Sequence, residues 1–278
     1  MLKIQEYGDV IRFDSSRTIA GRGYYWSTAY LIDGVLIDTG CAYSANELVY
    51  ALNGMDLVGI INTHAHEDHI GANGILQEKR KGLEIFAHPL AIPVLENPRE
   101  EQPMEFYRRM TWGIPMPSQA KPVRDGELIE TEQYAFQVIN TPGHSPDHIC
   151  LYEAKQAWLL TGDLFVGGQD RALREGYDIW QIIASLKRVV DLPMNILFPG
   201  CARIRENPKE VLRNKIQYLE ETGSKVLELH QQGKSEKEIT RMLFGGPMLV
   251  EVMTLGHFSR IHLVRSFLGL ENLLVSPL

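Results

Sequence analysis

Residues 64–69, with the sequence HAHEDH, concentrate side chains that bind metal ions. Imidazole and carboxylate groups are ligands of Zn²⁺ in proteins, and Mn²⁺ and Fe²⁺ use them as well. In an extended or tightly turning segment, residues i and i+2 project to one side, so His64 and His66 can share one ion. Asp68 and His69 follow where the chain turns, and they can face a second ion. Two ions about 3.5–4 Å apart can clamp a bridging hydroxide, as in two-metal hydrolases.

The elements that position these residues can be inferred from the apolar runs before them. The run LVGII at 57–61 predicts a buried strand, and the metal-binding residues then lie on the loop that leaves its carboxyl end. Open α/β layers place their chemistry at such ends. His144 follows a second strand-like run at 135–139, and Asp163 follows a third at 157–160. Because a carboxylate has two oxygens, Asp163 can bridge both ions.

The order of these motifs resembles that of the metallo-β-lactamase-fold hydrolase superfamily. The matching segments are HAHEDH at 64–69, TPGH at 141–144 and TGD at 161–163. The run LIDTG at 36–40 also resembles the turn that precedes the metal strand in that superfamily. The resemblance covers residues 10–203 and favours a branch similar to glyoxalase II or the lactonases. It leaves the substrate open, because the superfamily also includes β-lactamases, nucleases and phosphodiesterases.

This resemblance implies an α/β fold, a four-layer αββα sandwich with a small helical appendage, and a site for two divalent transition-metal ions. Zn²⁺ is the favoured metal, with Mn²⁺ or Fe²⁺ as alternatives. The implied ligands are His64, His66 and His144 for the first ion, and Asp68, His69 and the bridging Asp163 for the second. Asp68 would also act in catalysis, by orienting the nucleophile or protonating the leaving group. Asp38 and Thr39 are expected behind the ligands rather than among the catalytic groups.

One position departs from the family. The family has a metal-binding His in a Pro-Gly-His turn after a late strand, whereas this chain has Cys201 there. A Cys201 thiolate could bind, since a metal lowers the pKa of a thiol, but a free Cys is more commonly a small buried residue. We favour His257, in the run TLGHFS at 254–259, if the C-terminal segment folds back over the site. A packing role for His257, or no further ligand at all, are the alternatives.

Composition agrees with a globular enzyme of 278 residues, of which 44% are hydrophobic and 23% charged. A net charge of −7 argues against a nucleic-acid surface, because phosphate binding requires a basic face. Three Cys residues suggest a reducing compartment. The N-terminus is too polar for a signal peptide, and no apolar stretch reaches the roughly 18 residues of a membrane span. We therefore expect a cytoplasmic protein with a small-molecule substrate, and a homodimer stays open.

The chain is predicted to form a catalytic domain over 1–206 and a mostly helical appendage over 207–278. Two segments begin with the Ser-x-x-Glu signature of a helix capping box, namely 44–52 and 235–244. Apolar residues at helical spacing predict a further helix over 178–190.

Residues 96–122 are the least regular part of the catalytic domain, with five Pro residues among aromatic and Met side chains. Long irregular connections are usually functional or disordered, and the aromatic content argues against disorder. We expect a short helix over 104–110 and a flap over the active site, with peripheral packing or a dimer contact as the alternative. Arg108 and Arg109 could meet a substrate carboxylate, although most such pairs are solvated.

These expectations describe a hydrolase in which a metal-bridging hydroxide attacks the carbonyl of a small ester, thioester or lactone, without a Ser or Cys nucleophile. One alternative is a regulatory or binding module that keeps the metal with little turnover, and the missing Pro-Gly-His ligand supports it. The other is a phosphodiesterase or nuclease of the same fold, which the acidic net charge disfavours.

Overall fold

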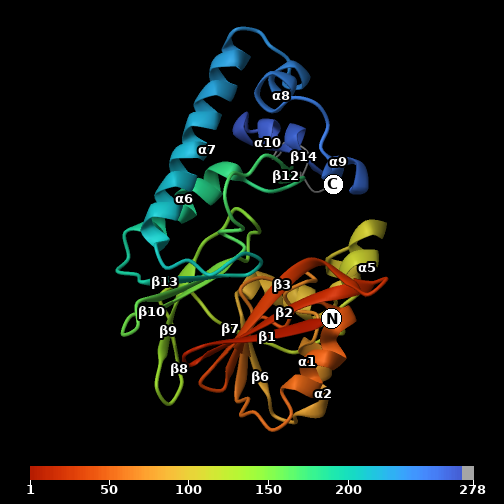
Figure 1. Ribbon diagram of the computed structural model, residues 1–278, viewed down its shortest axis with the longest axis vertical. Helices are drawn as coiled ribbons and strands as arrows, with labels where there is room; N and C mark the ends of the chain where they lie inside the picture. The colour runs from red at the N-terminus through yellow and green to blue at the C-terminus, as the bar shows by residue number, and fades with distance from the viewer. Residues whose placement is uncertain (271–278) are drawn as a thin grey trace. The chain divides into compact units, whose positions relative to one another are not determined.

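The computed structural model describes residues 1–270 and divides into two compact units (Figure 1). The first unit comprises Met1–Asn140, Pro146–Val166 and Pro193–Glu206. The second comprises Thr141–Ser145, Gly167–Leu192 and the chain from Asn207 on. Among residues 1–270, no helix is both long and apolar enough to cross a lipid bilayer. The predicted domain boundary at 206/207 stays a prediction.

A seven-stranded sheet forms one layer of the first unit, in the order β1-β2-β3-β4-β5-β6-β7. Strands β1 to β4 pair antiparallel, and β4 to β7 pair parallel. The parallel strands β4 and β5 are apolar throughout, as is typical of strands buried on both faces. The strands are β1 Leu2–Tyr7, β2 Val10–Ile19, β3 Arg22–Ile32, β4 Val35–Ile37, β5 Gly59–Ile61, β6 Glu84–Ala87 and β7 Lys121–Pro122.

A five-stranded sheet forms the second layer of this unit, in the order β13-β11-β10-β9-β8. Its strands pair antiparallel except β11 and β13, which are parallel. The strands predicted before His144 and Asp163 are confirmed as β9 and β11, and the late strand of the family corresponds to β13 before Cys201. The strands are β8 Leu128–Glu130, β9 Ala135–Asn140, β10 Ile149–Glu153, β11 Trp158–Gly162 and β13 Ile196–Pro199.

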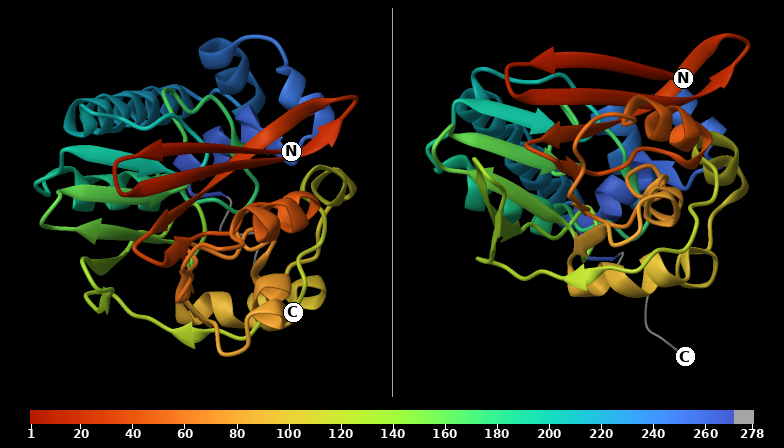
Figure 2. Two further views of the ribbon diagram at one scale, coloured as in Figure 1. Left: turned by 60° about the horizontal axis from the view of Figure 1, so that its bottom comes forward. Right: turned by 90° about the horizontal axis from the view of Figure 1, so that it is seen from below.

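Side chains from both sheets share one buried core, in which Tyr30 of β3 packs edge-on against Phe198 of β13 at 5.4 Å between ring centroids. A second core lies on the other face of the first sheet, where Leu48 of α1 and Leu76 of α2 pack against Ile60 of β5. The first sheet accordingly lies between the second sheet, green, and the orange helices α1 and α2 (Figures 1 and 2). Burying each such large side chain contributes roughly 1.5–3 kcal/mol.

The helices of the first unit are short, and in the sequence they connect strands of the first sheet. The capping box predicted for the first of them is wrong, because Ser44 is the last residue of a 3-10 turn and lacks the extended backbone of a cap residue. Its hydroxyl donates instead to the Cys41 carbonyl at 3.1 Å, and Glu47 pairs with the ammonium group of Met1 at 3.0 Å. The helices are α1 Ala45–Ala51, α2 Asn73–Lys79, α3 Ile92–Glu96, α4 Pro98–Glu101 and α5 Phe106–Trp112, with 3-10 turns η1 Ala42–Ser44 and η2 Pro89–Ala91.

The irregular segment 96–122 contributes α5, which begins and ends two residues later than the predicted helix. It ends in β7, which extends the first sheet by pairing with β6. Its role as a flap stays a prediction.

The second unit is mostly helical. The capping box predicted at Ser235 is confirmed, since Ser235 N donates to Glu238 Oε2 at 2.9 Å and Glu238 N donates to Ser235 Oγ at 3.4 Å. The helix predicted over 178–190 is also confirmed, with Asp178 as its cap. The elements are α6 Ile179–Val190, α7 Pro208–Gln231, α8 Glu236–Phe244, α9 Leu249–Met253 and α10 Arg260–Phe267, and a small sheet of β12 Leu173–Arg174 and β14 Phe258–Ser259.

Close packing in the second unit depends on a glycine in α7. A Cβ atom at Gly223 would lie 2.8 Å from the Phe267 ring and 2.9 Å from the Trp180 ring, so no larger residue fits without a shift. The two rings pack edge to face at 5.3 Å, and Trp180 Nε1 donates to the Phe267 carbonyl at 3.0 Å. This contact joins α6, α7 and α10.

A buried ion pair joins the middle of α9 to the first residue of α10. Arg260 binds Glu251 with two hydrogen bonds, of 2.7 and 2.8 Å, and its side chain is only 6% exposed. Burial raises the pKa of Glu251, but the bonds from Arg260 and from the Met248 amide lower it more, to about 2. The folded state therefore stabilises the ionised form of Glu251.

We expect Glu251→Gln to destabilise the protein at pH 7 by about 3–5 kcal/mol, because it leaves a buried guanidinium without its counter-charge. The folded pKa lies below the unfolded value, so the contribution of Glu251 is present above about pH 4.5 and is lost as the pH falls towards 2. Thermal unfolding of both proteins at pH 7 and pH 3 measures this, and the difference should shrink at pH 3. Glu236→Gln, which removes a more exposed pair with Arg265, is the control and should cost less than about 1 kcal/mol. A constant difference across this pH range would contradict the prediction.

Candidate metal centre

The chemistry-bearing residues of the first unit follow the carboxyl ends of its strands. Asp38 comes directly after β4, and His64 is the third residue after β5. Because β4 and β5 are parallel neighbours, these side chains meet at one edge of the sheet. Asp163 comes directly after β11 of the other sheet. The loop over residues 64–69 is called the metal loop below.

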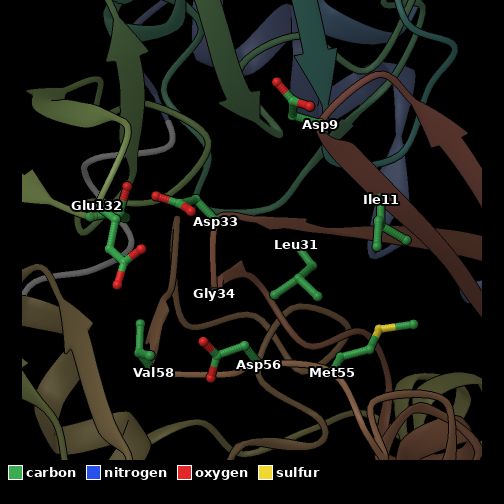
Figure 3. Close-up of a pocket in the computed structure, with 10 residues that line it drawn as sticks. Asp9, Ile11, Leu31, Asp33, Gly34, Met55, Asp56, Val58 and Glu132 are labelled. Carbon is green, nitrogen blue, oxygen red and sulfur yellow. The ribbon is translucent and has the colours of Figure 1, made fainter.

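A cavity of about 330 Å³ lies at the amino ends of β4 and β5, opposite to the ends that lead to Asp38 and the metal loop (Figure 3). Its lining includes Gly34 and Val58, which directly precede β4 and β5, together with Asp33 and Asp56. It is therefore separate from the metal loop, which follows the carboxyl ends.

The imidazoles of the metal loop form a buried cluster. The ring of His64 lies 4.5 Å from that of His66 and 4.2 Å from that of His69, measured between centroids. His64 and His69 are fully buried, and His66 is 8% exposed. One ligand atom each of His64, His69 and Asp163 lies within 4.8 Å of the other two, which is close enough for one ion to bind all three.

His69 is held so that one nitrogen faces carboxylates across a gap. Its Nδ1 lies 2.8 Å from Asp38 Oδ2, which fixes the ring. Its Nε2 lies 3.5 Å from Asp163 Oδ1 and 3.7 Å from Asp68 Oδ2, distances that are long for hydrogen bonds. Within residues 1–270 this buried nitrogen has no hydrogen-bond partner. A metal ion between the three groups would satisfy it, so these residues fit the ion that the family implies.

The electrostatics of this cluster favour a cation. Burial raises the pKa of Asp68 to about 7, and the Glu67 and Asp163 carboxylates add to the rise, while His69 lowers it. Burial lowers the pKa of His69, but Asp163, Asp38 and Asp68 together raise it well above its usual value. The confined carboxylates contribute to both shifts, while burial adds to the shift at Asp68 and opposes the shift at His69. A divalent ion would offset that negative charge.

Asp38 is a strained residue with two tasks. Its φ of +60° is in the left-handed region, which Asp tolerates better than most residues and which often marks a functional site. Besides His69, its carboxylate accepts from Thr63 N and Thr63 Oγ1, both at 2.8 Å. It therefore fixes both the start of the metal loop and one expected ligand. The expectation that Asp38 lies behind the ligands agrees with this geometry.

Two further residues support the cluster and were not assigned from the sequence. Asp147, 7% exposed, accepts from Ala65 N in the metal loop at 2.7 Å. His148 Nε2 accepts from Asp163 N at 3.1 Å, and its ring lies 5.1 Å from that of His64. Their signal in the sequence was an acid and an imidazole three and four residues after the expected ligand His144.

His144 belongs to the second unit, in the segment Thr141–Ser145. Within that unit its ring packs on Tyr177 at 4.5 Å between centroids, and the Tyr177 hydroxyl lies 3.4 Å from His144 Nε2. Its predicted role, to share the first ion with His64 and His66, stays a prediction.

The extra ligand expected from Cys201 or His257 also stays a prediction. A Cβ atom at Gly200 would lie 2.8 Å from both Asp163 Oδ1 and the His69 ring, so the backbone before Cys201 passes directly beside the cluster. Within residues 1–270, however, the Cys201 thiol joins no group of three ligand atoms. His257 lies in the second unit, where its carbonyl accepts from Glu175 N at 3.0 Å.

The profile of the Metallo-beta-lactamase superfamily matches residues 27–201, which is more than half of the chain. The chain therefore belongs to the metallo-β-lactamase superfamily and is a metal-dependent hydrolase. The predicted family and fold class are confirmed.

Curated relatives at moderate identity include hydroxyacylglutathione hydrolases. GloC of Haemophilus influenzae is 29% identical over 170 residues, which are 59% of this chain and 76% of the relative. A hydroxyacylglutathione hydrolase of Chelativorans is 27% identical over 219 residues, which are 77% of this chain and 73% of the relative. Both matches support a branch similar to glyoxalase II.

Solved structures confirm the fold. A metallo-β-lactamase family protein of Thermus thermophilus superposes with a TM-score of 0.68 at 21% identity, covering 94% of this chain and 92% of its own. TTHA1623, solved in a di-iron-bound form, superposes with a TM-score of 0.56 at 32% identity, covering 70% of this chain and 96% of its own.

We expect Asp38→Asn to lower the affinity for metal by about 10–100-fold, because an amide cannot accept from Thr63 and orient His69 at the same time. Competition with a chromophoric chelator measures the affinity. Asp33→Asn is the matched control, since Asp33 lies at the opposite end of β4 and accepts from Gln133. Equal affinities for the two variants would show that Asp38 does not support the site.

Proposed function

We propose that this metal-dependent hydrolase cleaves a small thioester, with esters and lactones as the next substrate classes. The observation that carries the proposal is His69, whose buried Nε2 faces the carboxylates of Asp68 and Asp163 across a gap of metal-ligand dimensions. The thioester preference rests on the hydroxyacylglutathione hydrolases among the relatives, whose name describes a thioester substrate.

The bound metals would supply a Lewis acid and lower the pKa of a water molecule to near neutrality. The residues of the chain would hold the ions and orient the water. His64, His66 and His144 would hold the first ion, and His69, Asp68 and Asp163 the second. Asp68 is 17% exposed, whereas His69 is fully buried. Asp68 can therefore exchange a proton with solvent, which suits the role of orienting water or protonating the leaving thiol.

The donor set of imidazoles and carboxylates suits several ions. Zn²⁺, Fe²⁺ and Mn²⁺ all take these ligands. A thiolate would bias the site towards Zn²⁺, but within residues 1–270 the groups of ligand atoms contain no Cys. We propose two ions, with Zn²⁺ as the first choice. The di-iron form of TTHA1623 supports iron as the principal alternative.

Purified protein should contain up to two transition-metal ions and should hydrolyse a hydroxyacylglutathione thioester faster than a lactone, a β-lactam or a phosphodiester. His66→Ala should lose metal and at least about 90% of the activity, because it removes one direct ligand. His230→Ala, on the exposed side of α7, is the control and should change neither. Elemental analysis and the four assays measure this.

Each other outcome identifies an alternative. Fastest cleavage of the phosphodiester would indicate the nuclease branch of the superfamily. Full metal occupancy without turnover of any substrate would indicate the binding or regulatory module. Less than about a tenth of an ion per chain after growth with Zn²⁺, Mn²⁺ and Fe²⁺ would refute the metal site itself.

Helix α5 carries aromatic side chains that suit contact with an acyl group. Trp112 packs edge-on against Tyr107 at 6.5 Å and against Tyr25 of β3 at 6.2 Å, and it is half-buried. Tyr25 has a strained φ of +53°, which aims an exposed aromatic ring at this cluster. We propose that this aromatic cluster contacts the substrate.

Trp112→Ala should raise KM by about threefold to tenfold, since one aromatic contact contributes about 0.5–1.5 kcal/mol. Metal content should stay that of the parent protein. Tyr50→Ala removes an exposed aromatic ring on α1 and is the control. Steady-state kinetics on the best substrate, with elemental analysis, decide the point, and unchanged KM would make the cluster a packing element only.

A further inference from the structure

Arg108 of α5 is buried against the metal loop. Its guanidinium binds both carboxylate oxygens of Glu67, with Nε donating to Oε1 at 2.6 Å and Nη2 donating to Oε2. Both side chains are at most 2% exposed. Its third nitrogen donates to Glu105 Oε2 at 3.3 Å. The expectation that Arg108 is solvated or meets a substrate carboxylate is therefore wrong, because Glu67 already takes that place.

Glu67 lies between two expected ligands, His66 and Asp68, at the start of a turn. His69 N donates to the His66 carbonyl across this turn at 2.9 Å. A planar guanidinium that binds a carboxylate with two parallel bonds fixes its position and its plane. Holding the Glu67 side chain therefore restricts the backbone that carries both neighbours.

Alternate residues from Thr63, directly before the metal loop, to His69 are held by different parts of the first unit. The bonds are those of Thr63 with Asp38, of Ala65 with Asp147, of Glu67 with Arg108, and of the His69 carbonyl with Thr39 N at 2.7 Å. The expected ligands His64, His66 and Asp68 alternate with these anchored positions. Three anchors directly follow, or lie within a few residues of, sheet strands. The fourth, Arg108, comes from the irregular segment 96–122.

A buried ion pair is a costly way to obtain stability alone. Removing two charges from water costs several kcal/mol each, and apolar residues of similar size often stabilise a fold as well or better. What an apolar pair cannot supply is the fixed, two-bond geometry of a guanidinium on a carboxylate. The pair is therefore better suited to positioning the loop than to stabilising it.

We propose that Arg108 is a positioning residue, which acts through Glu67 to set the geometry of the metal loop and so the affinity for metal. This inference rests on the proposed function, since it requires that the loop bind metal. Segment 96–122 then serves the metal centre through α5, in addition to any contact of its aromatic side chains with substrate.

The test compares metal affinity with stability in matched variants. Arg108→Met should lower both the unfolding temperature and, by about 10–100-fold, the affinity measured by chelator competition. The double variant Glu67→Leu with Arg108→Met removes both buried charges and should recover most of the unfolding temperature. Its metal affinity should stay at least about tenfold below that of the parent, because the two-bond contact is still missing.

Two further variants complete the test. Arg260→Met breaks a buried Arg–Glu pair in the second unit and should lower the unfolding temperature without changing metal affinity. Arg108→Lys keeps the positive charge but lacks the planar guanidinium that makes two bonds to Glu67. This variant should fold, and its affinity for metal should be about tenfold below that of the parent. It keeps the test decisive if the Met variants fail to fold.

The outcomes separate the inference from the proposed function. One outcome is that the parent binds metal and the affinity of the Arg108→Lys variant or of the double variant lies within about threefold of the parent's affinity. Arg108 is then structural only, and the inference is overturned. Recovery of affinity together with stability in the double variant overturns it too. If the parent itself binds no metal, the proposed function fails and the inference falls with it.

Discussion

Three carboxylates converge on the buried imidazole of His69, and this confined negative charge is the constraint on which the site depends. Asp38 fixes one ring nitrogen, while Asp68 and Asp163 face the other across a gap. Such a cluster is unfavourable away from water unless a cation offsets it. The same arrangement that would be a defect in a core is therefore well suited to a divalent ion. Stability of the loop and its capacity to bind metal are consequences of one set of contacts.

Holding these ligands requires rigid support, and the fold provides it at the ends of its strands. The two sheets of the first unit share a core of large side chains, and the backbone leaving β4, β5 and β11 inherits their rigidity. The strain at Asp38, with its φ of +60°, is tolerated because the flanking strand and three hydrogen bonds over-determine its position. Arg108 extends this support to the part of the loop that the strands do not reach.

Sequence patterns predicted the local structure correctly where both partners of an interaction are close together in the chain. The Ser235 capping box formed because Glu238 is three residues away and bonds back to Ser235. The identical signature at Ser44 failed, since Glu47 is drawn to the ammonium group of Met1 and the chain enters α1 through a 3-10 turn. Arg108 was misjudged for the same reason, because its partner is 41 residues distant. A pattern of residues carries no information about such distant competitors.

The sequence by itself determined the family, the fold class and the chemistry of the metal loop. Ligand-type residues directly after apolar strands are local features, and parallel pairing brings the ends of such strands together. The resemblance to the family already indicated Asp38 behind the ligands. Only the tertiary structure decided that Asp38 supports His69 in particular, and that Asp147 holds Ala65 and Arg108 holds Glu67. The physical reason is that a buried polar group must find a partner, and the fold, not the spacing along the chain, decides which partner is within reach.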